Sequence, residues 1–129
     1  MDRNEEVARV RALIEDWTKA VREGDMEGVL ARHTADILMF DVPMPLQARG
    51  MEEYRKTWEL FFRYSPGGPG SFDIEEMRVE VGGDIAYACG IVGVVGNRVR
   101  LTLGLRREEG EWRIAHEHHS YPHELPEDA

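Results

Sequence analysis

Apolar and polar positions in the first part of the chain follow a helical period. Apolar residues three and four apart give a helix one buried face, and here they are Val7, Val10, Leu13, Ile14, Trp17, Ala20 and Val21. Asn4 stands at the N-cap position, and Gly24 can supply the left-handed stop. Asp25 can cap a second, short helix over residues 26–30. We therefore expect two helices joined by Gly24-Asp25.

The next segments predict one strand followed by a third helix. The apolar run 37–42 is too short for a helix and is typical of a strand. Pro43 and Pro45 should end it, because proline cannot donate to a sheet ladder. Gly50 precedes another helical pattern, with an apolar face made of Met51, Tyr54, Trp58, Phe61 and Phe62. The Pro- and Gly-rich tract 65–70 should then form a loop.

Beyond residue 70 the apolar period changes to two, which is typical of strands. Four such segments cover residues 72–81, 85–95, 99–107 and 112–121. The short turns between them favour hairpins and an antiparallel meander. The element order predicts an α+β fold with helices packed on a mostly antiparallel sheet. We expect a single domain over residues 1–129, with a core at about 7–122 and a weakly ordered tail at 123–129.

Composition and charge narrow the classes of function. The 129 residues hold 16 Lys and Arg against 25 Asp and Glu, so the formal net charge is −9. Such a surface repels phosphate backbones, and no nucleic acid is expected as a partner. No stretch approaches the roughly 18 apolar residues of a membrane helix, and the charged N-terminal residues do not form a signal peptide. The single Cys89 does not imply an oxidising compartment. We expect a cytoplasmic protein that binds no membrane.

Several positions together resemble the nuclear transport factor 2-like superfamily, in its SnoaL-like and ketosteroid isomerase-like branch. They are Gly24-Asp25 between the first helices, Asp41 closing the first strand, Gly50 before the third helix and the segment 112–120. The resemblance covers the chain from about residue 7 to residue 122. It implies a cone-shaped, cystatin-like roll with three N-terminal helices on a curved sheet and an apolar pocket at the open end. It also implies a homodimer that packs through the outer sheet face.

Asp41 is the first candidate catalytic residue. A carboxylate in apolar surroundings can serve as a general base near neutral pH. In ketosteroid isomerases an aspartate at the matching position moves the proton of the steroid, so the resemblance implies the same role for Asp41. The side chain could instead cap the turn before Pro43. The sequence leaves both interpretations open.

Two other parts of the isomerase site have no counterpart here. Trp17 stands closest to the position of that family's first-helix tyrosine, and its indole cannot titrate. The segment 101–105 should hold the family's protonated aspartate, yet it contains no acid. Without those donors an enolate would lose its main stabilisation. A true ketosteroid isomerase is therefore not expected.

Histidines gather near the C-terminal end. In a regular strand the even-numbered residues from 114 to 120 share one face, and the odd-numbered residues from 115 to 121 share the other. Trp112 and Ile114 indicate that the even set faces inward, which would place His116 and His118 near the pocket mouth. An imidazole there can act as an acid or a base. We expect an Asp41–His118 catalytic pair, although the histidines could instead hydrogen-bond within the sheet.

The ligand-binding wall should consist of large apolar and flanking polar side chains. The expected set is Trp17, His33, Phe40, Tyr54, Trp58, Phe62, Tyr87 and His116. The helical spacing of the aromatic residues is equally typical of core packing, and His33 could instead interact with the end of the second helix. The His116–His118 spacing fixes no third ligand, so no metal site is expected. No cofactor is expected either, because no glycine-rich phosphate loop is present.

The sequence therefore favours a cofactor-free enzyme of the isomerase or lyase type. It would use general acid–base catalysis to isomerise, cyclise or dehydrate a small apolar or polycyclic molecule. The alternative is a non-catalytic ligand-binding or dimerisation module of the same fold. Fold alone does not decide between them.

Overall fold

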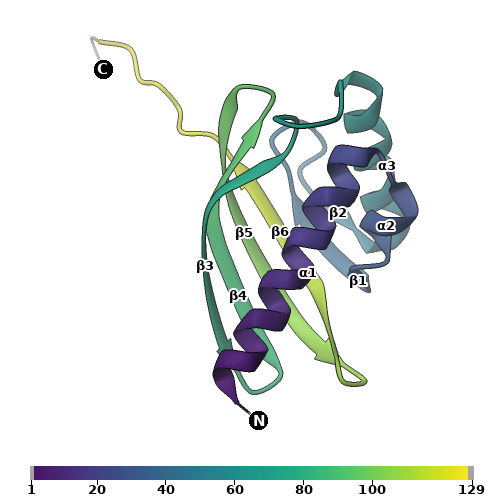
Figure 1. Ribbon diagram of the computed structural model, residues 1–129. Helices are drawn as coiled ribbons and strands as arrows, with labels where there is room; N and C mark the ends of the chain where they lie inside the picture. The colour runs from purple at the N-terminus through teal and green to yellow at the C-terminus, as the bar shows by residue number, and fades with distance from the viewer. Residues whose placement is uncertain (1, 128–129) are drawn as a thin grey trace.

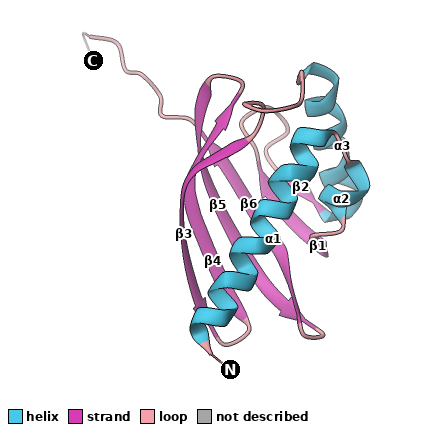
Figure 2. Cartoon of the chain, viewed as in Figure 1, coloured by secondary structure: helices cyan, strands magenta, loops and turns pink. Residues whose placement is uncertain are grey.

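A computed structural model describes residues 2–127, in which a long helix crosses one face of a curved sheet (Figure 1). The two shorter helices lie beside it, near the edge formed by the first strands (Figure 2). The elements are α1 (Arg3–Glu23), α2 (Met26–Leu30), β1 (His33–Phe40), β2 (Ala48–Arg49), α3 (Gly50–Tyr64), β3 (Asp73–Gly82), β4 (Ile85–Val94), β5 (Asn97–Glu108) and β6 (Glu111–Ser120). This is the α+β cystatin-like architecture that the sequence predicted. No helix in the described part is long and apolar enough to cross a membrane.

The ends of the first two helices follow from local side-chain chemistry. Asp2, and not Asn4, is the N-cap of α1, since its carboxylate accepts from the backbone N–H of Asn4 at 2.9 Å. The predicted cap was therefore wrong by two residues. Gly24 ends α1 with φ 67°, the left-handed conformation that glycine adopts without strain. Asp25 caps α2 by accepting from Gly28 N–H at 3.0 Å.

The six strands lie in the order β2-β1-β6-β5-β4-β3. Strands β3 to β6 form the expected antiparallel meander, and β1 pairs with β6 in parallel. His33 is the first residue of β1, and its Nδ1 lies 2.7 Å from the Val29 carbonyl near the end of α2, which is one of the two interactions expected for it. Since β1 ends at Phe40, Asp41 follows the strand. The two-residue β2 was not predicted, because it shows no periodicity of its own.

The hydrophobic core lies between α1, α3 and the concave face of the sheet. Both helices direct their apolar stripes to it, and β5 presents every second residue. Its largest fully buried side chains include Ile14, Trp17, Tyr54, Phe72, Leu101, Leu103 and Ile114. Beyond β6, residues 121–126 form neither helix nor strand and leave the body as a tail (Figure 1). The end of the expected weakly ordered tail, residues 128–129, lies outside the described residues.

A β-bulge in β6 decides which histidines face the core. Gly104 of β5 is opposite His116, whereas the next residue, Leu105, is opposite Ile114, so Ala115 is the extra residue. An extra residue in one strand reverses its inward and outward alternation. Trp112 and Ile114 are buried before the bulge, and Glu117 and His119 are buried after it.

The expectation that His116 and His118 face the interior is therefore wrong. Both side chains lie on the outer face of the sheet, where their rings pack against Phe40 at 5.0 and 5.3 Å. His116 also bonds through Nδ1 to the Leu38 carbonyl at 2.7 Å, and His118 is exposed.

Candidate functional site

A cavity of about 540 Å³ lies at one end of the sheet, between α3 and the ends of β4, β5 and β6. Its apolar lining includes Trp58, Leu60, Phe61, Phe72, Val94 and Val99. The polar side chains in its wall include Asp41, Thr57, Asn97 and His119. The space suits a small, largely apolar ligand held by a few polar groups.

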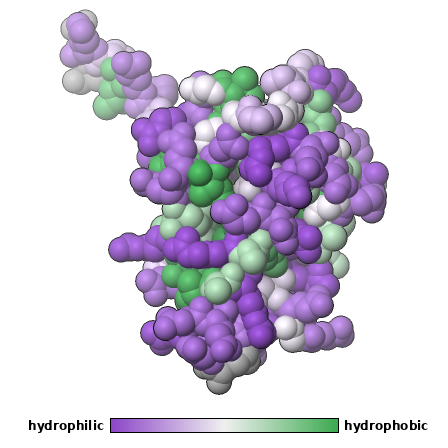
Figure 3. Space-filling model, viewed as in Figure 1, coloured by the Kyte–Doolittle hydropathy of each residue, from purple (hydrophilic) through white to green (hydrophobic). Residues whose placement is uncertain are grey.

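The rim of this cavity is apolar and open to solvent. Leu60, Tyr64, Val95 and Tyr121 line the cavity and are between 40% and 77% exposed. The face in Figure 3 is mostly hydrophilic, with hydrophobic atoms in several places, one of them at the upper end between the tail and α3. An apolar ligand therefore has an accessible way in.

A smaller cavity of about 200 Å³ adjoins the first. Residues 41–48 form most of its wall, together with Lys56 and Glu53 of α3. Asp41, Pro43, Thr57 and Leu60 belong to both cavities. Asp41 consequently stands at the boundary between two spaces.

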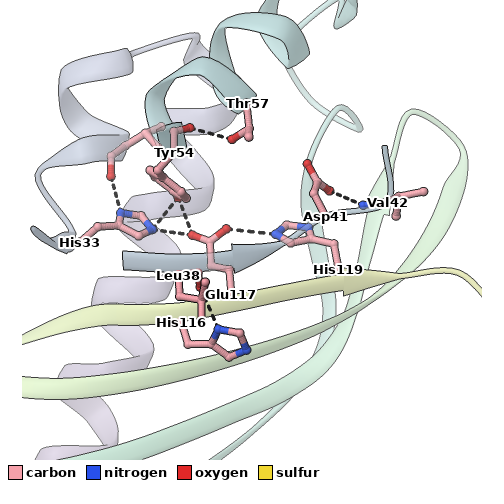
Figure 4. Close-up of polar contacts among 10 residues, drawn as sticks. His33, Leu38, Asp41, Val42, Tyr54, Thr57, His116, Glu117 and His119 are labelled. Atoms are coloured by element: carbon pink, nitrogen blue, oxygen red, sulfur yellow. Dashed lines mark hydrogen bonds and ion pairs between the residues drawn. The ribbon is translucent and has the colours of Figure 1, made fainter. Parts of the chain in front are cut away.

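Asp41 combines both roles that the sequence left open. Its Oδ1 accepts from the Val42 backbone N–H at 2.8 Å, which fixes the turn after β1. The half-buried carboxylate also lines the large cavity, and Figure 4 shows it on the same side of β6 as the His119 ring. The turn contact thus holds Asp41 at the cavity wall.

Glu117 is a fully buried carboxylate at the centre of a polar cluster (Figure 4). On one side, its Oε1 accepts from the Tyr54 hydroxyl at 2.5 Å and contacts Nε2 of His33. On the other side, its Oε2 accepts from Nε2 of His119 at 3.0 Å. The cluster connects β1, α3 and β6, and His119 is its only member in the cavity wall among the described residues.

Burial and opposite charges act against each other in this cluster. Burial alone would raise the pKa of Glu117, but the charges of His33 and His119, with the bonds they donate, outweigh it and hold that pKa at about 2. Burial lowers the pKa of His119, but the hydrogen bond to Glu117, its charge and that of Asp41 outweigh this effect and raise it. Glu117 is therefore ionised at neutral pH, and His119 retains its proton more readily.

Tyr54 remains a neutral donor in this setting. Burial, followed by the negative charge of Glu117, raises the pKa of its phenol well above the usual value, although the nearby indoles of Trp17 and Trp58 act in the opposite direction. Neither indole N–H forms a hydrogen bond within residues 2–127. Tyr54 thus donates a hydrogen bond to Glu117 and keeps its own proton, so it adds no second negative charge.

This arrangement provides the parts of an acid–base site. Glu117 holds Nε2 of His119, which leaves Nδ1 as the ring nitrogen available to a ligand. A carboxylate that orients an imidazole also stabilises its cationic form. Asp41, which lines the same cavity, provides a carboxylate that can accept a proton.

Of the site residues expected from sequence, Asp41 and Trp58 line the large cavity. His33 and Tyr54 lie behind the wall in the Glu117 cluster, and Trp17 is buried in the core. The remaining expected residues, Phe40, Phe62, Tyr87, His116 and His118, line neither cavity. The structure does not form the expected Asp41–His118 pair: His119 lies in the cavity wall with Asp41.

Sequence reasoning missed Glu117 and His119 because it assumed an unbroken alternation along β6. No residue in 112–121 marks the bulge by itself. One hint in the sequence is Gly104, a lone glycine inside the pattern of the strand that pairs with β6, because such a glycine often marks a bulge or a close approach. A second hint is that the polar run 116–119 must bury some of its members if the strand belongs to a core. Among residues 2–127, no group of three or more His, Cys, Asp or Glu side chains is arranged to hold a metal ion.

Comparison with known proteins now places the chain in a family. A profile of the SnoaL-like domain matches residues 10–124. The chain belongs to the SnoaL-like domain family. This membership confirms the predicted nuclear transport factor 2-like superfamily and its SnoaL-like branch. No curated protein matches the sequence.

Solved structures agree with this assignment. An NTF2-like protein of unknown function from Pseudomonas putida KT2440 is 32% identical, with a TM-score of 0.85 over 95% of this chain and 90% of that chain. Two more distant structures share the fold. One, from Streptomyces avermitilis, has a provisional dehydratase assignment within the NTF2-like family, with 20% identity and a TM-score of 0.78 over 91% and 96% of the two chains. The other, from Erwinia carotovora atroseptica SCRI1043, is described as ketosteroid isomerase-like, with 23% identity and a TM-score of 0.71 over 91% and 96%.

Proposed function

We propose that this SnoaL-like protein is a cofactor-free enzyme that moves a proton on a small apolar or polycyclic molecule. The observation that carries the proposal is the placement of His119. Its ring lies in the wall of an apolar cavity that Asp41 also lines, and a buried carboxylate holds its far nitrogen. Isomerisation, cyclisation and dehydration all begin from such a step.

The residues divide the step between a base and an acid. Asp41 takes a proton from a carbon beside a carbonyl group, and the electron pair of the broken C–H bond moves into an enol or enolate. His119 donates a hydrogen bond or its Nδ1 proton to the carbonyl oxygen, where negative charge develops. Return of a proton to another carbon completes an isomerisation, whereas loss of a neighbouring hydroxyl as water completes a dehydration.

The alternative, a non-catalytic ligand-binding or dimerisation module, has two observations in its favour. Asp41 accepts from the backbone of its own turn, and His116 bonds to the Leu38 carbonyl, as such a module would predict. The open cavity fits ligand binding with or without turnover. The acid–base pair in the cavity wall favours the enzyme, because binding alone does not need an imidazole held by a buried carboxylate.

We further propose that the protein forms a homodimer through the outer face of the sheet. Ile85 and Tyr87 of β4 are 59% and 48% exposed on the described chain. Apolar side chains exposed on a sheet face are typical of a surface that another chain covers.

Deuterium incorporation tests proton transfer without knowledge of the natural substrate. A panel of apolar cyclic ketones is incubated with the protein in D₂O, and loss of the α-proton signal is followed by NMR. We expect exchange above the buffer rate for at least one ketone. Asp41→Asn and His119→Asn should each slow that exchange by about 10²–10⁴-fold, the usual contribution of a positioned acid or base.

Two histidine controls make the result specific. His118→Asn changes the neighbouring residue on the opposite face of β6, and His123→Asn changes an exposed residue of the tail. Both should keep the wild-type exchange rate. Loss of exchange in His118→Asn but not in His119→Asn would overturn the assignment, and saturable ketone binding without exchange would favour the binding module.

A further inference from the structure

His33 is a buried titratable residue to which the proposed reaction gives no task. It lies on the far side of Glu117 from the cavity, and both side chains are 0% exposed. Elements on two sides fix its ring: Val29 of α2 bonds to Nδ1, and Glu117 of β6 contacts Nε2. A histidine held at both nitrogens is more constrained than packing alone requires.

The hydrogen bonds assign the protons of this ring. The Val29 carbonyl lies 2.7 Å from Nδ1, and a carbonyl can only accept, so Nδ1 carries a proton. Nε2 lies against Oε1 of Glu117 and 2.6 Å from the Tyr54 hydroxyl oxygen, and Tyr54 donates its single hydrogen to Oε1, so Nε2 faces two acceptor oxygens. Nε2 therefore carries a proton as well. With a proton on each nitrogen, this geometry makes His33 a cation beside the Glu117 carboxylate.

Glu117 thus serves two imidazoles with one negative charge. Oε1 accepts hydrogen bonds from His33 and from the Tyr54 hydroxyl, while Oε2 accepts one from His119 at 3.0 Å. Because His33 already neutralises the carboxylate, His119 gains its hydrogen bond without facing an uncompensated anion. An uncompensated buried anion would hold a nearby imidazole in the charged form.

We propose that His33 is a positioning residue, the permanent counter-ion of Glu117, and that it leaves His119 able to lose and regain its proton in the cavity. The inference rests on the proposed function, because the proposed reaction requires His119 to lose and regain a proton. It does not need the substrate to be known, since it concerns the protein's own protons.

The charged neighbours of His119 come from all sides of the cluster. The titratable groups are Glu117 of β6, Asp41 after β1, His33 of β1 and Tyr54 of α3. The aromatic rings within 6.4 Å, those of Trp58 and Phe72, carry no charge. Since Tyr54 stays neutral, removal of His33 removes the one buried cation besides His119 in this described cluster.

A purely structural role for His33 is the competing explanation. Its ring packs against Tyr54 at a centroid distance of 4.4 Å and against Trp17 at 6.0 Å. A packing role predicts that loss of His33 loosens the cluster and leaves the titration of His119 unchanged or lowered. A counter-ion role predicts that the same loss raises the pKa of His119. The two roles therefore differ in the sign of a measurable shift.

The test is an NMR titration of the His119 imidazole in three proteins. His33→Gln keeps a donor near Glu117 but removes the charge, and we expect it to raise the pKa of His119 by about 1 unit or more. Glu117→Gln should lower the same pKa, because it removes the anion. An unchanged or lowered pKa of His119 in His33→Gln would overturn the proposal.

A measurement on the wild-type protein covers the case in which His33→Gln does not fold. The ¹⁵N shifts of the His33 ring report directly whether one or both nitrogens carry a proton. We expect both to be protonated at pH 7, and a neutral ring there would refute the counter-ion role. Neither experiment depends on turnover, so a failure of the proposed enzyme function in the ketone assay remains a separate result.

Discussion

Glu117 shows at the scale of a single residue how the site is held together. A charge with no exposed surface is costly unless donors surround it, and three side chains from three elements donate to this one. Removal of the donors or of the anion should lower the free energy of unfolding, because the remaining partners would stay buried and unpaired. The cluster therefore links stability to the chemistry of His119.

The buried carboxylate predicts a loss of stability in acid. Glu117 has a pKa of about 2 when folded and 4.5 in the unfolded reference. Its contribution is present above pH 4.5 and is lost as the pH falls from there towards 2. The shift corresponds to a free energy on the order of 3 kcal/mol.

Urea unfolding between pH 6 and pH 2.5 measures this contribution. The wild type should lose more of its free energy of unfolding than Glu117→Gln over that range, since other carboxylates titrate equally in both proteins. Parallel curves for the two proteins would show that Glu117 is not ionised in the folded state.

His119 predicts the opposite dependence on the alkaline side. Its pKa is raised on folding, so its stabilising contribution is fully present below pH 6.5 and declines as the pH rises through the folded value. Comparing the free energies of unfolding of wild type and His119→Asn from pH 5.5 to pH 8.5 should show the difference shrinking with pH. A difference that stays constant would mean that the pKa of His119 does not change on folding.

The hydroxyl of Tyr54 should matter more than that of an exposed tyrosine. Tyr54→Phe removes a donor 2.5 Å from a buried carboxylate, which should cost about 1.5–3 kcal/mol of unfolding free energy. Tyr64→Phe is the matched control, because Tyr64 is 77% exposed, and it should change stability by less than about 0.5 kcal/mol. Equal effects of the two changes would contradict the proposed role of the cluster.

Strands and helices were predictable from sequence where their signals are local. The helical period from residue 7 to 21, the left-handed Gly24 and the turns between strands each lie within a few residues, so α1 and the β3–β6 meander follow from the chain itself. The bulge at Ala115 depends on how β6 pairs with β5, which no local pattern reports. Because of this one extra residue, the side chain of His119 faces the cavity and that of His118 faces outward.

The cluster around Glu117 could not be predicted for a related reason. Its members are separated by up to 84 residues along the chain, and only the packing of β1, α3 and β6 brings them together. His33 and Tyr54 were expected in the ligand-binding wall, but they lie behind it. Asp41 was predicted at a pocket from its position after an apolar strand and from family resemblance, and its side chain lines the large cavity.

The close pairing of β3 and β4 gives a prediction at the scale of elements. At Gly90 of β4 a Cβ would lie 2.0 Å from the Glu76 carbonyl oxygen of β3, so the two backbones approach closely only because the residue is glycine. Gly90→Ala should destabilise the protein by about 1–3 kcal/mol or more through overpacking. Gly82→Ala, at a glycine with nothing within 4 Å of the added Cβ, should have little effect in thermal or urea unfolding. Equal stability of the two variants would contradict this pairing of β3 and β4.

At the scale of the whole molecule, the two faces of the sheet present different side chains. The concave face packs on α1 and α3 and opens at one end into the cavity, while the outer face carries Ile85, Tyr87 and the outward histidines. The proposed homodimer would cover the outer face and leave the cavity mouth at the end of the sheet free. Each subunit would then bind its own ligand.

Sizing the protein in solution tests the proposed homodimer. Light scattering at high micromolar concentration should give twice the 14.8 kDa chain mass, and Tyr87→Glu should shift the protein towards the monomer by placing a charge in the interface. A wild-type protein that stays monomeric at that concentration would contradict the dimer without affecting the cavity.

The central claim is that the cavity receives an apolar ligand at His119. The most direct measurement is a titration with 2-naphthol, an apolar bicyclic probe, followed through the imidazole resonances of all five histidines. We predict a saturable shift of the His119 signals, while those of His118 and His123 stay in place. A response at His118 with none at His119, or no saturable response at any histidine, would contradict the account.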